Sequence, residues 1–230
     1  MSPRSARVNE EMREQSRERI LTAALEVFAA KGYHDATVTD ITTRAGVSRG
    51  LLNYYFPGKQ NLVEELLDRH LDAVTGVLDV TGTADERLAA IIDGILYAAS
   101  TTVPVQRMAL SLVVNPATLP LFAAAESRKE ERLRYMEDEL RGIFAERGAD
   151  DPALEEVLLR SVLEGVVFKI AVYTDDFPVE RVRRRLYAMY TLPEPDRTLL
   201  GAEPPPVGRM RANRVDREGR TSRAGRSDGA

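Results

Sequence analysis

The sequence contains no cysteine and no tryptophan, and only two of its 230 residues are histidines. Without cysteine the chain forms no disulfide, no thiolate metal site and no thiol nucleophile. His70 has no histidine or carboxylate three or four residues away, the spacing that would place a second ligand on the same face of a helix. We therefore expect no bound metal.

Motifs of nucleotide binding are also missing. The sequence has no G-x-x-x-x-G-K-[ST] and no G-x-G-x-x-G. G-x-S-x-G occurs at 46–50 and 225–229, but neither stretch follows a strand-like segment, which a nucleophile elbow requires. Its carboxylates are distributed as on the solvent faces of helices. These absences predict a protein with no catalytic residues and no cofactor.

Long apolar runs are absent as well. No stretch reaches about 18 apolar residues, and the N-terminus has no apolar signal core, so we expect a cytoplasmic protein without a membrane span. The net charge of −4 is unevenly distributed. Residues 1–60 carry 9 Lys and Arg against 7 Asp and Glu, a net +2, while residues 61–191 carry 15 against 23, a net −8. A basic end on an acidic body fits a protein that contacts DNA at one end.

Apolar residues recur at helical spacing throughout, and no segment alternates like a strand, so we predict an all-α fold. The sequence divides into a disordered arm at 1–13, a DNA-binding domain at 14–60, a helical body at 61–191 and a Pro- and Arg-rich disordered tail at 192–230. In the body, breakers separate helices expected at 84–100, 103–114, 117–147, 152–175 and 178–191. A first helix is expected at 14–31, and another from residue 59 to about 80.

The stretch 37–59, TVTDITTRAGVSRGLLNYYFPGK, predicts two short helices joined by a tight turn. Thr37 with Asp40 three residues later fits a capping box, and Gly46 permits the left-handed conformation that ends a helix. Ser48 then caps a second helix, in which Leu52 and Phe56 lie four apart and face inward. This is the helix-turn-helix pattern.

The outward face of the second helix carries side chains suited to the major groove of DNA. Arginine reads guanine edges, asparagine reads adenine, and an apolar group contacts the thymine methyl. Hydroxyl groups and lysine can hold phosphates. The predicted DNA-binding residues are Thr37, Thr39, Ser48, Arg49, Gly50, Leu51, Asn53, Tyr54, Tyr55 and Lys59.

The order of an amphipathic helix followed by T-V-T-D-I-T-T-R-A-G-V-S-R-G-L-L-N-Y-Y-F-P-G-K-Q-N-L resembles the DNA-binding domain of TetR-type transcriptional regulators. The resemblance covers roughly residues 14–71. It implies a homodimer that binds a DNA operator and places a small-molecule effector site in the helical body.

The helix at 152–175 is apolar nearly all round, and the last helix is amphipathic opposite a cluster of arginines. An interior helix is one explanation. The other, which the resemblance supports, is a dimer interface formed by Val162, Val166, Leu186 and Met189. Apolar residues mixed with a few polar ones suggest an effector pocket. Its candidates are Tyr97, Gln106, Met108, Asn115, Phe122, Tyr135 and Phe168.

The sequence thus favours a homodimeric, ligand-responsive DNA-binding regulator, in particular a repressor. The alternative is a helical carrier of a small molecule in which the helix pair is only structural. The exposed grouping of Arg49, Asn53 and Tyr54 favours the regulator. The two tails are expected to be plain solvated segments, and contact of their arginines with DNA is the alternative.

Overall fold

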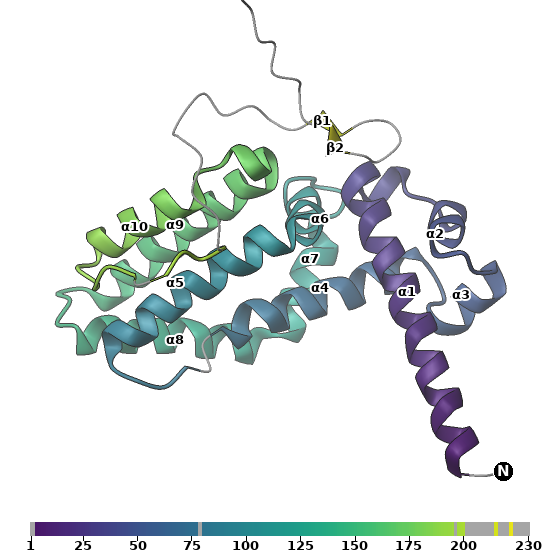
Figure 1. Ribbon diagram of the computed structural model, residues 1–230, viewed down its shortest axis with the longest axis horizontal. Helices are drawn as coiled ribbons and strands as arrows, with labels where there is room; N and C mark the ends of the chain where they lie inside the picture. The colour runs from purple at the N-terminus through teal and green to yellow at the C-terminus, as the bar shows by residue number, and fades with distance from the viewer. Residues whose placement is uncertain (1–2, 78–79, 196, 201–213, 216–220, 223–230) are drawn as a thin grey trace, which may run out of the picture. The chain divides into compact units, whose positions relative to one another are not determined.

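The computed structural model describes residues 3–77, 80–195, 197–200, 214–215 and 221–222 (Figure 1). Within these ranges the chain is almost entirely helical, and the predicted all-α fold is confirmed. The helices are α1 (Pro3–Asp35), α2 (Val38–Ala45), α3 (Arg49–Tyr55), α4 (Lys59–Gly76), α5 (Ala84–Thr101), α6 (Val103–Val113), α7 (Leu119–Arg128), α8 (Glu130–Glu146), α9 (Pro152–Tyr173) and α10 (Val179–Met189), with a 3-10 turn η1 (Thr174–Asp176) after α9. Two short strands, β1 (Arg214–Val215) and β2 (Thr221–Ser222), pair antiparallel.

The chain divides into two compact units. Unit 1 comprises Met1–His70 and Met108–Ser127, and unit 2 comprises Leu71–Arg107 and Arg128–Ala230. The expected domain boundary after residue 60 therefore differs from the structure. Helix α4 continues past that point, and its buried Leu62, Val63, Leu66 and Leu67 belong to unit 1.

In unit 1, α1 supplies the apolar stripe that the sequence predicts. Ile20, Leu21, Ala24 and Phe28 are each at most 2% exposed. The helix bends at Gly32, whose φ of +75° favours glycine, and Asp35 ends the last short turn. Helix α1 packs against α2, which in turn contacts α3.

The expected arm at 1–13 is wrong from residue 3 onward, because α1 already begins at Pro3. The segment has no proline or glycine after residue 3, and proline is well accommodated at the start of a helix. Arg13 lies 3.6 Å from Glu10 one turn earlier, and the Ser16 hydroxyl donates to the carbonyl of Met12. These contacts stabilise an exposed helical extension locally.

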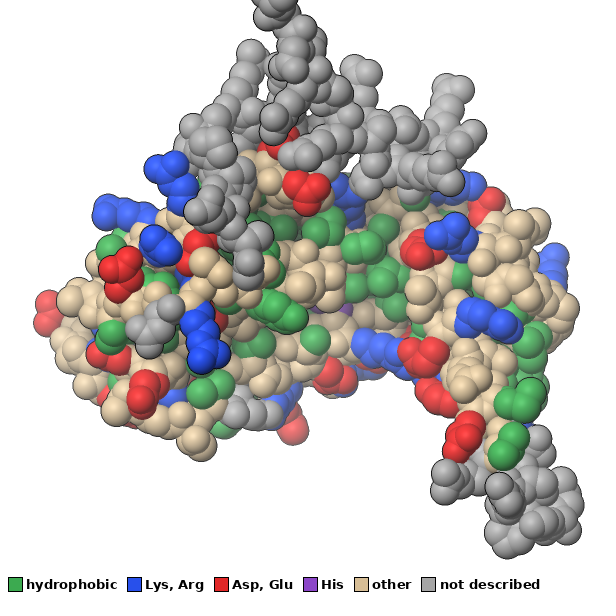
Figure 2. Space-filling view, viewed as in Figure 1, with side chains coloured by type: hydrophobic (Ala, Val, Ile, Leu, Met, Phe, Trp, Pro, Cys, Tyr) green, Lys and Arg blue, Asp and Glu red, His purple; other side chains and the backbone are tan. Residues whose placement is uncertain are grey.

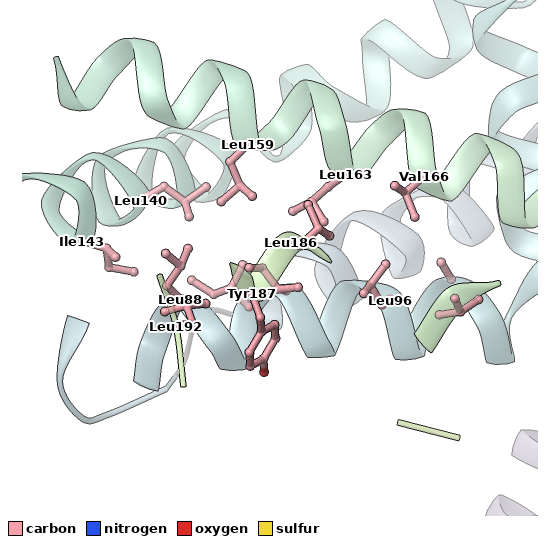
Figure 3. Close-up of a cluster of buried hydrophobic side chains, with 14 of the residues drawn as sticks. Leu88, Leu96, Leu140, Ile143, Leu159, Leu163, Val166, Leu186, Tyr187 and Leu192 are labelled. Atoms are coloured by element: carbon pink, nitrogen blue, oxygen red, sulfur yellow. The ribbon is translucent and has the colours of Figure 1, made fainter. Parts of the chain in front are cut away.

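Unit 2 is organised around one cluster of buried apolar side chains from α5, α8, α9 and α10 (Figure 3). Leu88 and Leu96 of α5 lie opposite Leu159 and Leu163 of α9 in this view. Burying a leucine side chain contributes about 1.5–3 kcal/mol, so these contacts hold the four helices together. On the face of unit 2 seen in Figure 2, cationic and anionic side chains are interspersed, as expected for helices with ion-paired surfaces.

Outside α1, two helix boundaries differ from the sequence prediction by more than two residues. The single helix expected at 117–147 is broken at Lys129, which separates α7 from α8 with φ −110° and ψ 13°. No proline or glycine lies near this break, so no local signal reveals it. Helix α4 ends at Gly76 rather than near residue 80.

The predicted disordered tail is wrong at its start. Leu192 is buried in the core of unit 2, and Leu199 packs against the same core. Arg183 of α10 donates to the carbonyl of Arg197 at 2.7 Å, and the Leu199 amide donates to Glu180 at 3.0 Å. The segment is held by polar bonds that amphipathic periodicity does not encode. Apart from β1 and β2, the prediction for residues beyond 200 falls outside the described residues.

Candidate nucleic-acid interface

Helix α2 begins with the capping box that the sequence predicts. The Thr37 hydroxyl accepts a bond from the Asp40 amide at 3.1 Å, and Asp40 Oδ2 accepts bonds from the Thr37 amide at 3.0 Å and hydroxyl at 2.8 Å. Lys31 donates to Asp40 Oδ1 at 2.8 Å. The bond from Lys31, followed by those from Thr37, lowers the pKa of Asp40 to about 2. The Thr37 hydroxyl is thus engaged in the cap.

The turn after α2 has the geometry of a Schellman motif. Gly46 is left-handed at φ 63° and ψ 38°. Its amide donates to the carbonyl of Thr43 at 3.3 Å, and the amide of Val47 donates to that of Thr42 at 3.1 Å. The Ser48 hydroxyl then accepts the amide of Leu51 at 3.1 Å and begins α3. Both helices are therefore fixed at the turn by backbone and cap bonds.

Helix α3 buries one face and exposes the other. Leu52 is 0% and Phe56 4% exposed, so these two anchor the helix. Arg49, Gly50 and Asn53 are exposed, Tyr54 is 69% exposed, and Leu51 and Tyr55 are half-buried. The rings of Tyr54 and Tyr55 meet edge to face at 5.0 Å. On α2, Thr39 is exposed and its hydroxyl is not used in the cap.

Arg49 and Asn53 are the side chains on this surface that are best placed to read bases. Neither donates to or accepts from any residue that the structure describes, so their donors and acceptors face solvent. A guanidinium and an amide one turn apart match the groups that guanine and adenine present in the major groove. The geometry therefore brings together the predicted base-reading residues on one open helix face.

Lys59 has a different role from the phosphate contact that the sequence suggests. Its ammonium group donates to the carbonyls of Tyr33 at 2.6 Å, His34 at 3.2 Å and Ala36 at 3.0 Å. It also lies 4.4 Å from the centre of the Tyr33 ring. An ammonium has three protons, and all three are used. Lys59 therefore fixes the end of α1 and the residue that follows it to the start of α4.

An ion-pair network that the sequence did not predict also connects α1 to α4. Arg69 of α4 bonds both carboxylate oxygens of Glu18 on α1, at 2.7 and 2.6 Å. Arg17 of α1 lies 2.7 Å from Glu65 of α4, and its guanidinium lies 5.4 Å from the Phe56 ring centre. Bidentate pairs restrict geometry more strongly than single contacts do. The Glu65–Arg69 spacing of four residues is the only part visible in sequence.

The predicted dimer residues divide into two groups. Val162 of α9 is 36% exposed and Met189 of α10 is 53% exposed, as an interface in the dimer would require. Val166 and Leu186 instead lie in the core of unit 2, at 9% and 2% exposure, so assigning them to an interface was wrong. Other exposed apolar residues of α9, outside the predicted dimer set, are Leu154, Val157, Leu158 and Phe168.

The predicted effector residues are distributed over both units. Tyr97, Tyr135 and Phe168 of unit 2 are exposed, and Gln106 of that unit is buried. The other three belong to unit 1: Met108 is buried, Phe122 is half-buried, and Asn115 accepts the amide of Ala117 through its side chain at 3.0 Å. The predicted effector set, chosen by residue type, thus mixes core, surface and turn residues.

The described part of the chain holds no group of three or more His, Cys, Asp or Glu side chains arranged for a metal ion. No single described helix has the length and apolar character of a membrane span. Helices α5 and α6 together have the length and composition of a span, but they are bent by 93° relative to each other.

The capped helix pair with an open, polar second helix defines a helix-turn-helix DNA-binding domain. Residues 20–66 match the family model described as "Bacterial regulatory proteins, tetR family". The HTH-type transcriptional regulator BetI of Escherichia coli strain UMN026 is 39% identical over 84 residues, which are 34% of this chain and 43% of that protein. The chain thus matches less than half the length of this curated relative.

Solved structures extend the likeness to the helical body. A member of the TetR transcriptional regulator family from Streptomyces coelicolor is 25% identical with a TM-score of 0.51, over 65% of this chain and 76% of its own. FadR from Bacillus subtilis, solved in complex with stearoyl-CoA, has the same fold at 19% identity, with a TM-score of 0.59 over 75% of this chain and 96% of its own. These findings show a TetR-type DNA-binding domain at residues 20–66, and the named relatives of the chain are transcriptional regulators.

Proposed function

We propose that this chain is a homodimeric repressor that binds a palindromic DNA operator and is released from it by a small-molecule effector. The observation that carries the proposal is the open face of α3, where the side chains of Arg49 and Asn53 make no bond to any described residue while Leu52 and Phe56 anchor the helix. A repressor of this kind acts where the chromosome lies, so the proposal includes a cytoplasmic location.

A palindromic operator follows from two-fold symmetry. Two recognition helices of a dimer read half-sites about 34–36 Å apart, one turn of DNA. An effector that binds more tightly to a dimer with other spacing lowers operator affinity by its differential affinity for the two states. FadR of Bacillus subtilis, with the same fold, was solved with stearoyl-CoA, which supports a small-molecule site in this fold.

Selection of genomic fragments by the purified full-length protein tests the DNA-binding part. We expect enrichment of one palindromic sequence. In titrations of matched and mismatched duplexes, Arg49→Ala or Asn53→Ala should cost about 1–3 kcal/mol and relax the preference at one base pair of each half-site. Arg185→Ala, an exposed arginine of α10, is the matched control. Equal losses on operator and scrambled duplexes would contradict base reading.

The dimer surface that we propose is the exposed apolar face of α9. Leu154, Leu158 and Val162 follow one another at spacings of four residues, with exposures of 52%, 47% and 36%. Met189 of α10 adds a fourth exposed apolar side chain, at 53%. A row of exposed apolar residues on one helix indicates an interaction surface, and a self-complementary patch suits a two-fold dimer.

Leu158→Glu tests this surface without disturbing the core of unit 2. An unpaired carboxylate buried at a two-fold interface is strongly unfavourable, so the variant should sediment as a folded monomer and lose operator binding. Ala145→Glu places the same charge on the exposed face of α8 and should leave the dimer intact. A Leu158→Glu protein that stays dimeric with normal circular dichroism would locate the interface elsewhere.

A further inference from the structure

Arg107 of α6 is a half-buried cation without a carboxylate partner in the described residues. Its Nε donates to the main-chain carbonyl of Ala171 at 2.8 Å. Ala171 lies in the last turn of α9, where carbonyls have no amide of their own helix to accept from. This bond uses one edge of the guanidinium. Nη1 and Nη2, at its tip, donate to no described residue.

The other arginines of unit 2 show how unusual this is. Five that are buried or half-buried each lie within 4 Å of a carboxylate. The pairs are Arg87 with Glu139, Arg141 with Glu137, Arg147 with Asp85, Arg160 with Glu156 and Arg183 with Asp93. Arg107 lacks such a pair, and burial lowers its pKa. A cation that has lost hydration without gaining a counter-ion is unfavourable for stability and suited to an external anion.

Two valines lie one helical turn from the bond between Arg107 and Ala171. Val103 precedes it by one turn on the same face of α6, and Val167 precedes Ala171 by one turn on α9. Both valines are half-buried and pack against the core of unit 2. An anion bound at the tip of the guanidinium would therefore lie beside aliphatic side chains. Two parallel N–H groups match the oxygens of a carboxylate or a phosphate.

We propose that Arg107 binds the charged head of the effector, and that the effector is an amphiphile with a carboxylate or phosphate head. This inference rests on the proposed function, because it assigns the chemistry of the molecule that releases the regulator from DNA. The competing explanation is that Arg107 serves only to tie α6 to the end of α9.

Thermal unfolding without ligand separates the two explanations. Arg147 also donates to a backbone carbonyl, that of Tyr190, but is paired with Asp85, so it is the matched control. We expect Arg147→Gln to lower the Tm clearly and Arg107→Gln to leave it unchanged or raise it, because the latter removes an unpaired charge. A fall in Tm for Arg107→Gln as large as that for Arg147→Gln would overturn the inference.

Three probes with the same aliphatic chain test the head group: decanoate, decyl phosphate and decanol. At least one of the two anions should raise the Tm of the full-length protein and decanol should not; which anion is more effective distinguishes carboxylate from phosphate. Arg107→Gln should weaken anion binding by about tenfold or more, and Arg107→Lys, which keeps the charge but loses the planar fork, should lie between. An equal response to decanol, an unchanged response in Arg107→Gln or no response of the wild type to any probe would overturn the inference.

The same probes added to wild-type protein bound to its selected operator connect this site to regulation. Release of the DNA by the anion, with no effect of decanol, is the expected result. A rise in Tm without release would show an anion site that is not the effector site and would overturn the assignment. Failure to select any operator would instead refute the proposed function, while the Tm series would still decide whether Arg107 binds the anion.

Discussion

The helix pair of unit 1 and the helical body of unit 2 are stabilised in different ways. In unit 1, α2 and α3 are held at their ends by contacts within a few residues, such as Thr37 with Asp40 and Ser48 with Leu51. In unit 2, α5 and α10 are joined by the pair of Asp93 and Arg183, which are 90 residues apart. Local contacts can be recognised in the sequence, whereas distant ones are recognisable only after folding.

The largest effect should come from breaking the distant pair. Arg183 bonds both oxygens of Asp93 at 2.6 Å and lies 3.2 Å from Glu180. Arg183→Ala leaves Asp93 without its bidentate partner and the buried Glu180 with only the exposed Arg184, and the loss of a buried pair's partner costs about 3–5 kcal/mol. Urea unfolding followed by circular dichroism measures the loss. Arg184→Ala, whose side chain is 53% exposed, should cost less than about 1 kcal/mol. Similar midpoints for the two variants would contradict the comparison.

Lys59 is the exception in unit 1, because its carbonyl partners lie 23 to 26 residues before it. Lys59→Met should destabilise the protein by about 1.5–3 kcal/mol, since the carbonyls lose a charged donor. Operator affinity should fall with it, and the salt dependence of the remaining binding should be unchanged. Lys31→Met, which removes an exposed pair with Asp40, is the control. Reduced salt dependence with unchanged stability would instead restore the phosphate contact that the sequence suggested.

The local caps should have smaller and similar effects in both units. Thr83 and Glu86 form a capping box at the start of α5 like that of Thr37 and Asp40. Thr37→Ala and Thr83→Ala should each cost about 1 kcal/mol. Thr37→Ser and Thr83→Ser, which keep the hydroxyl, should recover most of the loss. A large difference between the two alanine variants would show that one cap depends on its tertiary surroundings.

The smallest effect should be a pH dependence confined to unit 1. The pKa of Asp40 is lowered to about 2, from an ordinary value near 4. A lowered carboxyl pKa contributes stability above the unfolded value, and that stability is lost as pH falls from about 4 to about 2. Asp40→Asn should flatten the Tm profile in this window. Glu86 has a lowered pKa through Thr83 alone, with no cation, so Glu86→Gln should change the profile less. An equal change would contradict the role of Lys31.

The same contrast explains what the sequence could predict. Thr37, Asp40, Gly46 and Ser48 signal their helix ends through residue types with specific local bonds, and the structure confirms all four roles. The outward face of α3 followed because Leu52 and Phe56 fix its inward face.

The proposed dimer surface was harder to predict because α9 is apolar nearly all round. Periodicity alone does not distinguish the side with Val166, which meets the core, from the side with Leu158, which meets solvent. The role of Lys59 and the isolation of Arg107 were not predictable for a related reason. Each depends on which backbone carbonyls and carboxylates the fold brings near, and those lie far away in the sequence.

The N-terminal part of α1 extends beyond the packed core of unit 1, and this affects how fast its backbone hydrogen bonds open. From Ile20 to Phe28 its amides belong to a packed helix, whereas the described side chains before Ser16 are all exposed, including Val8 and Met12. A helical segment with few buried contacts opens with little free energy. Amide hydrogens of one continuous helix should therefore exchange with deuterium at rates that fall steeply from Arg13 toward Ile20. The boundary of the cooperatively folding unit lies inside α1, not at its first residue.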